Sequence, residues 1–192
     1  LGLVGSEMCI RDRFREVILG PATAPADVKR QLAVAADLVE RLLEDCREGS
    51  DTLPLLSLTL ARLYEDYGVT SKVLTLAQYE QMGGLNKVVQ SEIDAVLSSD
   101  EAQRGEQLAA LRAAFIPFLA TISPETDLPL RRVARYEDLP APSRPLVDAL
   151  VARRLLVKDV RDGQVVVEVA LESLLRQWDE LAEWLRAERA NL

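Results

Sequence analysis

Few side chains in this sequence could carry chemistry, and they form no recognisable catalytic set. Histidine is absent, which removes the commonest general base and the commonest metal ligand. Cys9 and Cys46 stand outside any Cys-x-x-Cys spacing, so they predict neither a disulfide framework nor a metal site. Gly83, Gly84 and Lys87 suggest a phosphate loop, but such a loop needs G-x-x-x-x-G-K-[ST] after a strand. We therefore reject a phosphate loop here and expect no hydrolysis by this chain alone.

Two other positions are candidates for ligand contact. Pro54 falls in the first turn of a predicted helix that is capped by Asp51 or Thr52 and ends at Gly68. A proline there fixes the backbone without offering a donor, which suits contact with a flat ring, but it equally suits the first turn of any helix. Leu171 follows a strand-forming run of valines and begins a predicted amphipathic helix.

Composition limits the classes of protein to consider. The chain has 192 residues, of which 48% are apolar, so it can bury the core of one domain or two small ones. Its 23 basic and 31 acidic residues give a net charge of -8, which repels a phosphate backbone and predicts no nucleic-acid partner. No apolar run approaches the ~20 residues that span a bilayer. We expect a cytoplasmic protein without a membrane segment.

The first thirteen residues are predicted not to be native. The run from Leu3 to Asp12, which includes Met8-Cys9-Ile10-Arg11, matches one reading frame of the transposon-end adapter used in sequencing libraries. Such segments are left out of fold reasoning. We expect the natural sequence to begin near Phe14, in the middle of a longer protein whose upstream part is missing.

Residues 14–99 are predicted to form a helical subdomain. Apolar residues recur at helical spacing over residues 36–47 and again from the capping site near residue 52 to residue 67. A brief helix is predicted over residues 76–81 after Thr75, and another over residues 88–97. This half of the chain predicts a small helical bundle.

Residues 100–192 are predicted to form a winged-helix domain with one β-hairpin. A helical run through residue 119 precedes an irregular stretch over residues 123–135, a short turn and a helix over residues 143–154. Two valine-rich segments then flank Asp162-Gly163, a favoured tight-turn pair, and predict a hairpin. One continuous amphipathic helix is expected from Leu171 onward. The predicted fold class is thus mainly α, a helical-bundle subdomain followed by a winged-helix domain.

Winged helices often bind DNA, and the helix over residues 143–154 would then read the major groove. Leu146, Val147, Leu150 and Val151 make most of its surface apolar, whereas groove recognition needs several polar or basic side chains on the outward face. We therefore favour packing of this helix against neighbouring domains.

Several stretches resemble the bacterial STAND NTPases, the signal-transduction ATPases with numerous domains. The run from residue 165 to residue 178 is similar to the family pattern V-E-V-A-H-E-A-L-[LI]-R-x-W, with Leu171 in place of the histidine. The run Leu53-Pro54-Leu55-Leu56 resembles the family's G-x-P motif. Residues 14–22 and 74–85 resemble two further family stretches, L-R-x-x-I-x-G-P-A and L-T-L-A-x-Y-E-x-x-G-G-L.

The resemblance implies a nucleotide-dependent switch. In the family the proline that matches Pro54 packs against adenine, and the histidine that aligns with Leu171 contacts a phosphate. The complete protein is then expected to bind ATP or ADP with magnesium in a cleft formed with an upstream P-loop ATPase core. It would carry WD40 or other repeats downstream, form homo-oligomers on nucleotide exchange, and act in signalling or defence. The alternative is a non-enzymatic winged-helix adaptor, possibly transcriptional, that binds no nucleotide.

Overall fold

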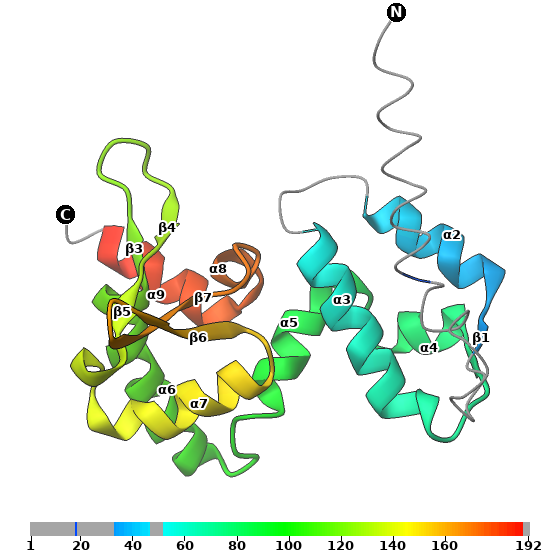
Figure 1. The fold of residues 1–192 in the computed structure, drawn as a ribbon, viewed down its shortest axis with the longest axis horizontal. Coiled ribbons are helices and arrows are strands. Elements are labelled where there is room, and N and C mark those ends of the chain that lie inside the picture. Colours follow the sequence, from blue (N-terminus) through cyan, green and yellow to red (C-terminus); the bar gives the residue numbers. More distant parts are fainter. Residues whose placement is uncertain (1–17, 19–32, 47–51, 190–192) are drawn as a thin grey trace, which may run out of the picture. The chain divides into compact units, whose positions relative to one another are not determined.

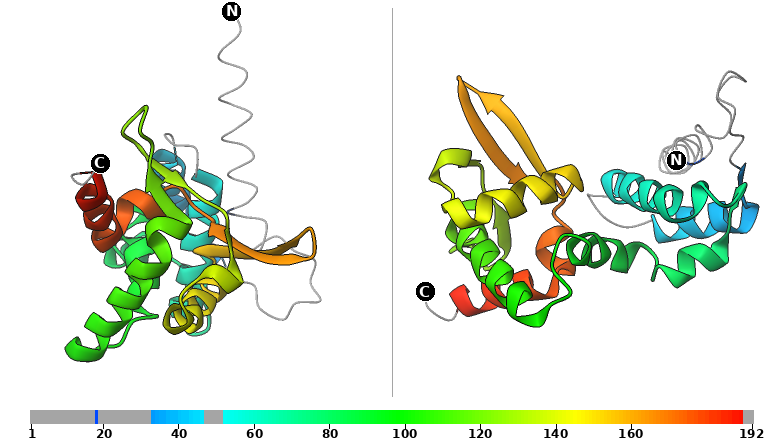
Figure 2. Two further views of the ribbon diagram at one scale, coloured as in Figure 1. Left: turned by 90° about the vertical axis from the view of Figure 1, so that its left-hand side faces the viewer. Right: turned by 90° about the horizontal axis from the view of Figure 1, so that it is seen from below.

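The computed structural model describes residue 18 and residues 33–46 and 52–189, which form two compact units (Figures 1 and 2). The first unit spans Leu1–Val88 and the second Val89–Leu192. Both are mostly helical with small sheets, which confirms the mainly α prediction. The predicted adapter segment, residues 1–13, lies outside the described residues, as does most of the stretch 14–22.

The first unit is built from amphipathic helices at the predicted places. They are α2 (Ala36–Asp45), α3 (Thr52–Leu63), which continues into a π-helical turn (Tyr64–Gly68), α4 (Leu76–Gln81) and the start of α5 (Leu85–Asp94). A short parallel pair, β1 (Ala33–Val34) with β2 (Val73–Leu74), was not expected from the sequence. The core of this unit consists of buried aliphatic side chains, among them Leu38, Leu42, Leu56, Leu63, Leu74 and Val88.

Tyr79 on α4 links α2 and the start of α5 through hydrogen bonds of its hydroxyl group. Thr75 and Gln78 form a capping box that fixes the start of α4, and Tyr79 follows on its buried face. The Tyr79 hydroxyl donates a hydrogen bond to Asp45 Oδ2 on α2 at 2.6 Å and accepts one from the Leu85 amide at 3.0 Å. Burial of the Tyr79 side chain is thus compatible with a polar tip whose hydrogen bonds are satisfied.

The second unit combines helices with two small antiparallel sheets. It contains the second part of α5, from Val89 on. Its other α-helices are α6 (Glu101–Ala114), α7 (Arg144–Ala152), α8 (Leu174–Gln177) and α9 (Asp179–Arg189). The predicted hairpin is confirmed as β6 (Leu156–Arg161) with β7 (Gln164–Val169), joined at Asp162 and Gly163, both of which have positive φ. Within the described residues β6 pairs only with β7, so it forms one edge of the sheet.

The stretch over residues 123–135, which the sequence predicts to be irregular, contains strands. β4 (Pro129–Arg131) forms a second hairpin with β3 (Ala120–Ile122), which lies just before this stretch. β5 (Ala134–Arg135) pairs with β7 to give the sheet order β5-β7-β6. The prediction of a single hairpin was therefore incomplete, because the second unit has two. These strands are two or three residues long, and pairing with distant partners rather than local pattern defines them.

The prediction of one continuous helix from Leu171 is wrong, because the helix is interrupted at Trp178. Leu171 precedes α8, and Trp178 has extended backbone angles (φ -90°, ψ 107°) between α8 and α9. Its indole is fully buried and meets the rings of Phe115 and Trp184 edge-on, with centroids 5.1 and 5.2 Å away. The break lets the largest side chain of this segment enter the core while α9 starts in a new direction.

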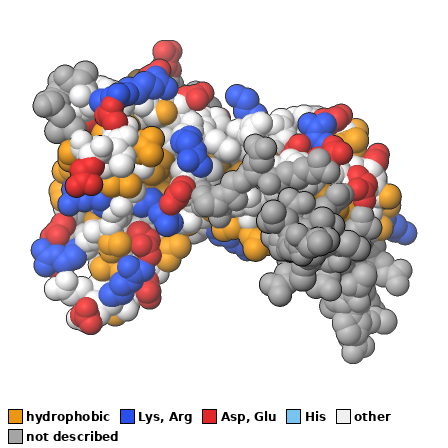
Figure 3. Space-filling model, turned by 90° about the horizontal axis from the view of Figure 1, so that it is seen from above, with side chains coloured by type: hydrophobic (Ala, Val, Ile, Leu, Met, Phe, Trp, Pro, Cys, Tyr) orange, Lys and Arg blue, Asp and Glu red, His pale blue; other side chains and the backbone are white. Residues whose placement is uncertain are grey.

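The surface carries mixed charge. On the face shown in Figure 3, acidic and basic side chains of the described residues lie interspersed, without an extended area of one sign. Among those same residues, no helix combines the length and apolar character that a bilayer crossing requires.

Candidate functional site

The backbone at Leu171 is fixed on both sides by hydrogen bonds. The Ala170 amide donates to the Leu155 carbonyl at 3.0 Å, and the Leu174 amide donates to the Leu171 carbonyl at 3.1 Å. The Leu171 side chain is 3% exposed and belongs to the core of the second unit, as do Leu174 and Trp178. The side chain at this position is therefore shielded from solvent.

Two charged side chains, Arg131 and Glu172, lie near the same junction. The sequence did not point to Arg131. Arg131 on β4 donates from Nη1 to the Val169 carbonyl at 3.4 Å and lies 3.7 Å from the Glu172 carboxylate. Its side chain is 45% exposed. A guanidinium is well suited to binding a phosphate or carboxylate, but here Glu172 offsets its charge. Arg131 was missed because its strand lies in the stretch predicted to be irregular.

Pro54 lies where the sequence predicts, in the first turn of α3, and it is exposed. The next two residues, Leu55 and Leu56, are buried. The missing amide of a first-turn proline costs no helical hydrogen bond, because the first amides of a helix lack partners. Its ring is accessible within the first unit, and next to it the Leu53 side chain is 50% exposed. Pro54 and Leu171 belong to different units.

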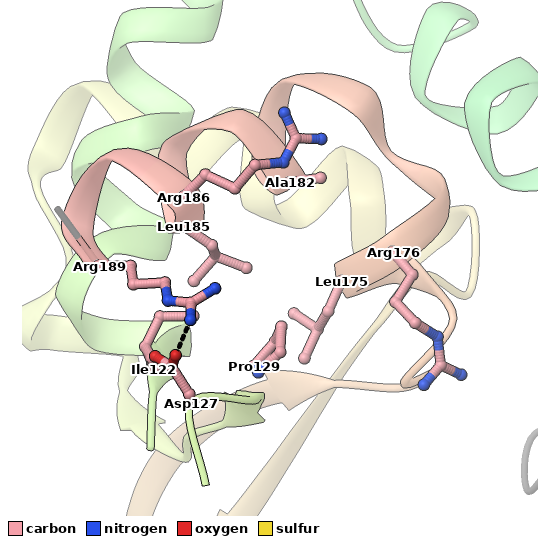
Figure 4. A pocket seen from close by; sticks show the side chains of 9 residues that line it. All are labelled: Ile122, Asp127, Pro129, Leu175, Arg176, Ala182, Leu185, Arg186 and Arg189. Carbon is pink, nitrogen blue, oxygen red and sulfur yellow. Dashed lines mark ion pairs between the residues drawn. The ribbon is translucent and has the colours of Figure 1, made fainter. Parts of the chain in front are cut away.

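The second unit also contains a pocket of about 290 Å³ between the β3–β4 hairpin and helices α8 and α9 (Figure 4). We call it the arginine-rimmed pocket. Apolar side chains form its floor: Ile122, Pro129, Leu175, Ala182 and Leu185. Its charged lining consists of one carboxylate and three guanidinium groups: Asp127, Arg176, Arg186 and Arg189. Sequence reasoning missed this pocket because its walls come from segments about fifty residues apart, one of which was not expected to form strands.

One ion pair crosses the arginine-rimmed pocket. Arg189 at the end of α9 pairs with Asp127 in the turn between β3 and β4. Neither in this pocket nor anywhere else in the described residues is a group of three or more histidine, cysteine or acidic side chains placed to hold a metal ion.

Comparison with family models gives a match over nearly the whole chain. The family model described as Novel STAND NTPase 1 matches residues 4–192. No curated protein and no solved structure matches the chain.

Proposed function

The chain belongs to the novel STAND NTPase 1 family, and from this membership we propose that it forms the helical and winged-helix part of an ATP/ADP-dependent molecular switch. The family match over nearly the whole chain carries the proposal. The G-x-x-x-x-G-K-[ST] pattern is missing from these 192 residues. In the proposed switch, the phosphate loop and the magnesium ligands therefore belong to a separate ATPase core. Nucleotide exchange then drives self-association for signalling or defence.

The two candidate site residues fit the nucleotide unequally. The exposed ring of Pro54 fits contact with adenine, because it offers a rigid apolar surface and no donor. Leu171 does not fit a phosphate, since its side chain is apolar and 3% exposed. We assign no phosphate contact to Leu171 as it stands, and this position is proposed as the place of the family's sensor histidine.

A leucine at the sensor position has a consequence for the switch. A ligand shifts a two-state equilibrium only through unequal affinity for the two states. Without a donor at residue 171, ADP loses one charged hydrogen bond, which is worth roughly 1.5 to 3 kcal/mol. The closed ADP-bound state is then less stable than in relatives that have the histidine, and ADP exchanges for ATP more readily.

The proposal is tested on the complete open reading frame that encodes these residues. We expect the ATPase core to bind fluorescent ADP about tenfold more tightly when it is joined to this chain than when it is expressed alone, because a lid slows release. Pro54→Ala should weaken ADP binding by about threefold or more. Pro145→Ala is the matched control, since Pro145 is also an exposed proline in the first turn of a helix, α7.

Equal ADP affinity with and without this chain would contradict the lid and favour the adaptor. Equal effects of Pro54→Ala and Pro145→Ala would remove Pro54 from the nucleotide site. In the complete protein, Leu171→His should slow ADP release about tenfold, because each 1.4 kcal/mol is a factor of ten. Unchanged release would show that residue 171 only packs the core.

A further inference from the structure

We propose that the arginine-rimmed pocket binds a short acidic peptide segment that carries one apolar anchor side chain. Its floor is firm, because Ile122, Leu175 and Leu185 are 7%, 3% and 2% exposed and belong to the core. Its volume of about 290 Å³ is just below the range of pockets for small-molecule ligands, which measure ~300 to 1,000 Å³. The floor therefore accepts one or two apolar side chains and not a large cofactor.

The rim selects for negative charge. The chain as a whole has a net charge of -8, yet three arginines and a single aspartate line this pocket. Arg176 and Arg186 are exposed, and neither forms an ion pair with another residue of the described ranges. Their guanidinium groups extend outward from the floor in Figure 4. An acidic partner would gain charge-assisted hydrogen bonds here that no other residue of the described part of the chain makes with these two side chains.

Asp127 shows that the rim accepts a carboxylate. Its backbone is left-handed, with φ 62°, and its amide donates to the Ser123 carbonyl at 2.9 Å. The Ser123 amide in turn donates to the Leu128 carbonyl at 2.9 Å, so the turn is closed by two backbone bonds. This turn holds the Asp127 carboxylate on Arg189. We infer that Asp127 occupies the place of a ligand carboxylate and competes with the partner for Arg189.

The positions of the arginines favour a peptide over a single small anion. Arg176 comes from α8, whereas Arg186 and Arg189 lie one turn apart on α9. In Figure 4 Arg176 and Arg189 lie on different sides of the apolar floor. A ligand that reaches both sides needs two negative groups separated by an apolar one. An acidic–apolar–acidic peptide has that order of groups.

The test uses the whole chain and a fluorescein-labelled peptide, Gly-Ser-Glu-Glu-Leu-Glu-Glu-Ser-Gly, followed by fluorescence anisotropy. We expect saturable binding that weakens with added salt. Arg176→Ala and Arg186→Ala should each weaken binding about fivefold to tenfold, and Asp127→Asn should strengthen it by about threefold or more. Arg112→Ala on α6 is the matched control, because it removes an arginine that is also exposed but does not line the pocket.

Several outcomes would overturn the proposal. No binding of the peptide would refute the proposal as a whole. Equal binding of the peptide with glutamine in place of every glutamate would remove the role of charge. Equal binding of the peptide with glycine in place of leucine would leave only a simple anion site. Stronger binding to phosphatidylglycerol vesicles, without competition by the peptide, would assign the surface to lipid. Melting curves of all variants should match that of the parent chain, since only exposed side chains are changed. The assay contains no nucleotide, so its result does not depend on the proposed switch.

Discussion

Arg153 Nη1 donates a hydrogen bond to Glu92 Oε2 at 3.1 Å, and the Glu92 side chain is only 4% exposed. Glu92 lies on α5, and Arg153 is the C-cap of α7. A carboxylate this deeply buried depends on its cationic partner, because an unpaired buried charge is costly. The pair therefore fixes the C-terminal end of α7 to α5 within the second unit.

Removing the cation should destabilise the second unit. Arg153→Ala leaves the buried carboxylate of Glu92 without this partner, and we expect a loss of about 2 to 3 kcal/mol in unfolding free energy. This is below the full cost of breaking a buried pair because the Arg153 side chain is 35% exposed. Urea denaturation measures it. Arg112→Ala, at an exposed site on α6, should cost less than about 0.5 kcal/mol, and equal losses would contradict the assignment.

Without the ATPase core and its nucleotide, Leu171→His should lower the stability of this chain by about 2 to 4 kcal/mol, because it buries an imidazole that has no phosphate to bond. Calorimetry on this chain measures the change independently of any nucleotide. Leu128→His is the control, since the Leu128 side chain is 61% exposed and should tolerate the change. An unchanged melting temperature for Leu171→His would show that residue 171 can turn toward solvent.

Two glycines should respond in opposite directions to the same substitution. Gly163→Ala forces a side chain into left-handed backbone at φ +76°, so we expect a loss of about 1 to 2 kcal/mol. Gly105→Ala lies inside α6 with no atom near the added Cβ, so it should gain about 0.5 to 1 kcal/mol. Chemical denaturation of both variants checks this. A loss at both positions would contradict the open environment of Gly105.

Stability should fall at alkaline pH in part through Cys46. Burial, with a smaller contribution from the charge of Asp45, raises the pKa of the Cys46 thiol from 9.0 to about 11. A raised pKa in the folded state gives stability that is complete below pH 9 and is lost as the pH rises toward 11. The fall in unfolding free energy between pH 9 and pH 11 should be shallower in Cys46→Ala. An identical slope in both proteins would show that the thiol does not contribute.

Elements with local signals were predicted well from the sequence. α4 begins and ends where Thr75 and the glycines place it, because a capping box fixes its first turn. The β6–β7 hairpin follows from Asp162-Gly163, whose positive φ angles suit the tight turn. Pro54 was placed correctly for the same reason, since the start of α3 has its own capping and proline signals.

Features that depend on distant partners were missed. β5 forms only because Ala134 and Arg135 pair with residues of β7 more than thirty positions later. The break at Trp178 interrupts an apolar spacing that fits a continuous helix, and burial of the indole against Phe115 decides the outcome. The arginine-rimmed pocket needs both the unexpected β3–β4 hairpin and the redirected α9. No local pattern could have brought these together.

The position of β6 at the edge of its sheet bears on how copies of this protein behave at high concentration. An unpaired strand edge can template intermolecular pairing, and Val157 and Val160 are exposed there. Charged residues, Lys158, Asp159 and Arg161, lie between and beside these valines, and Lys158 is held by Asp148 at 2.8 Å. The charges act as gatekeepers against edge-to-edge aggregation. Removing them would lower refolding yield and solubility before it weakened the fold.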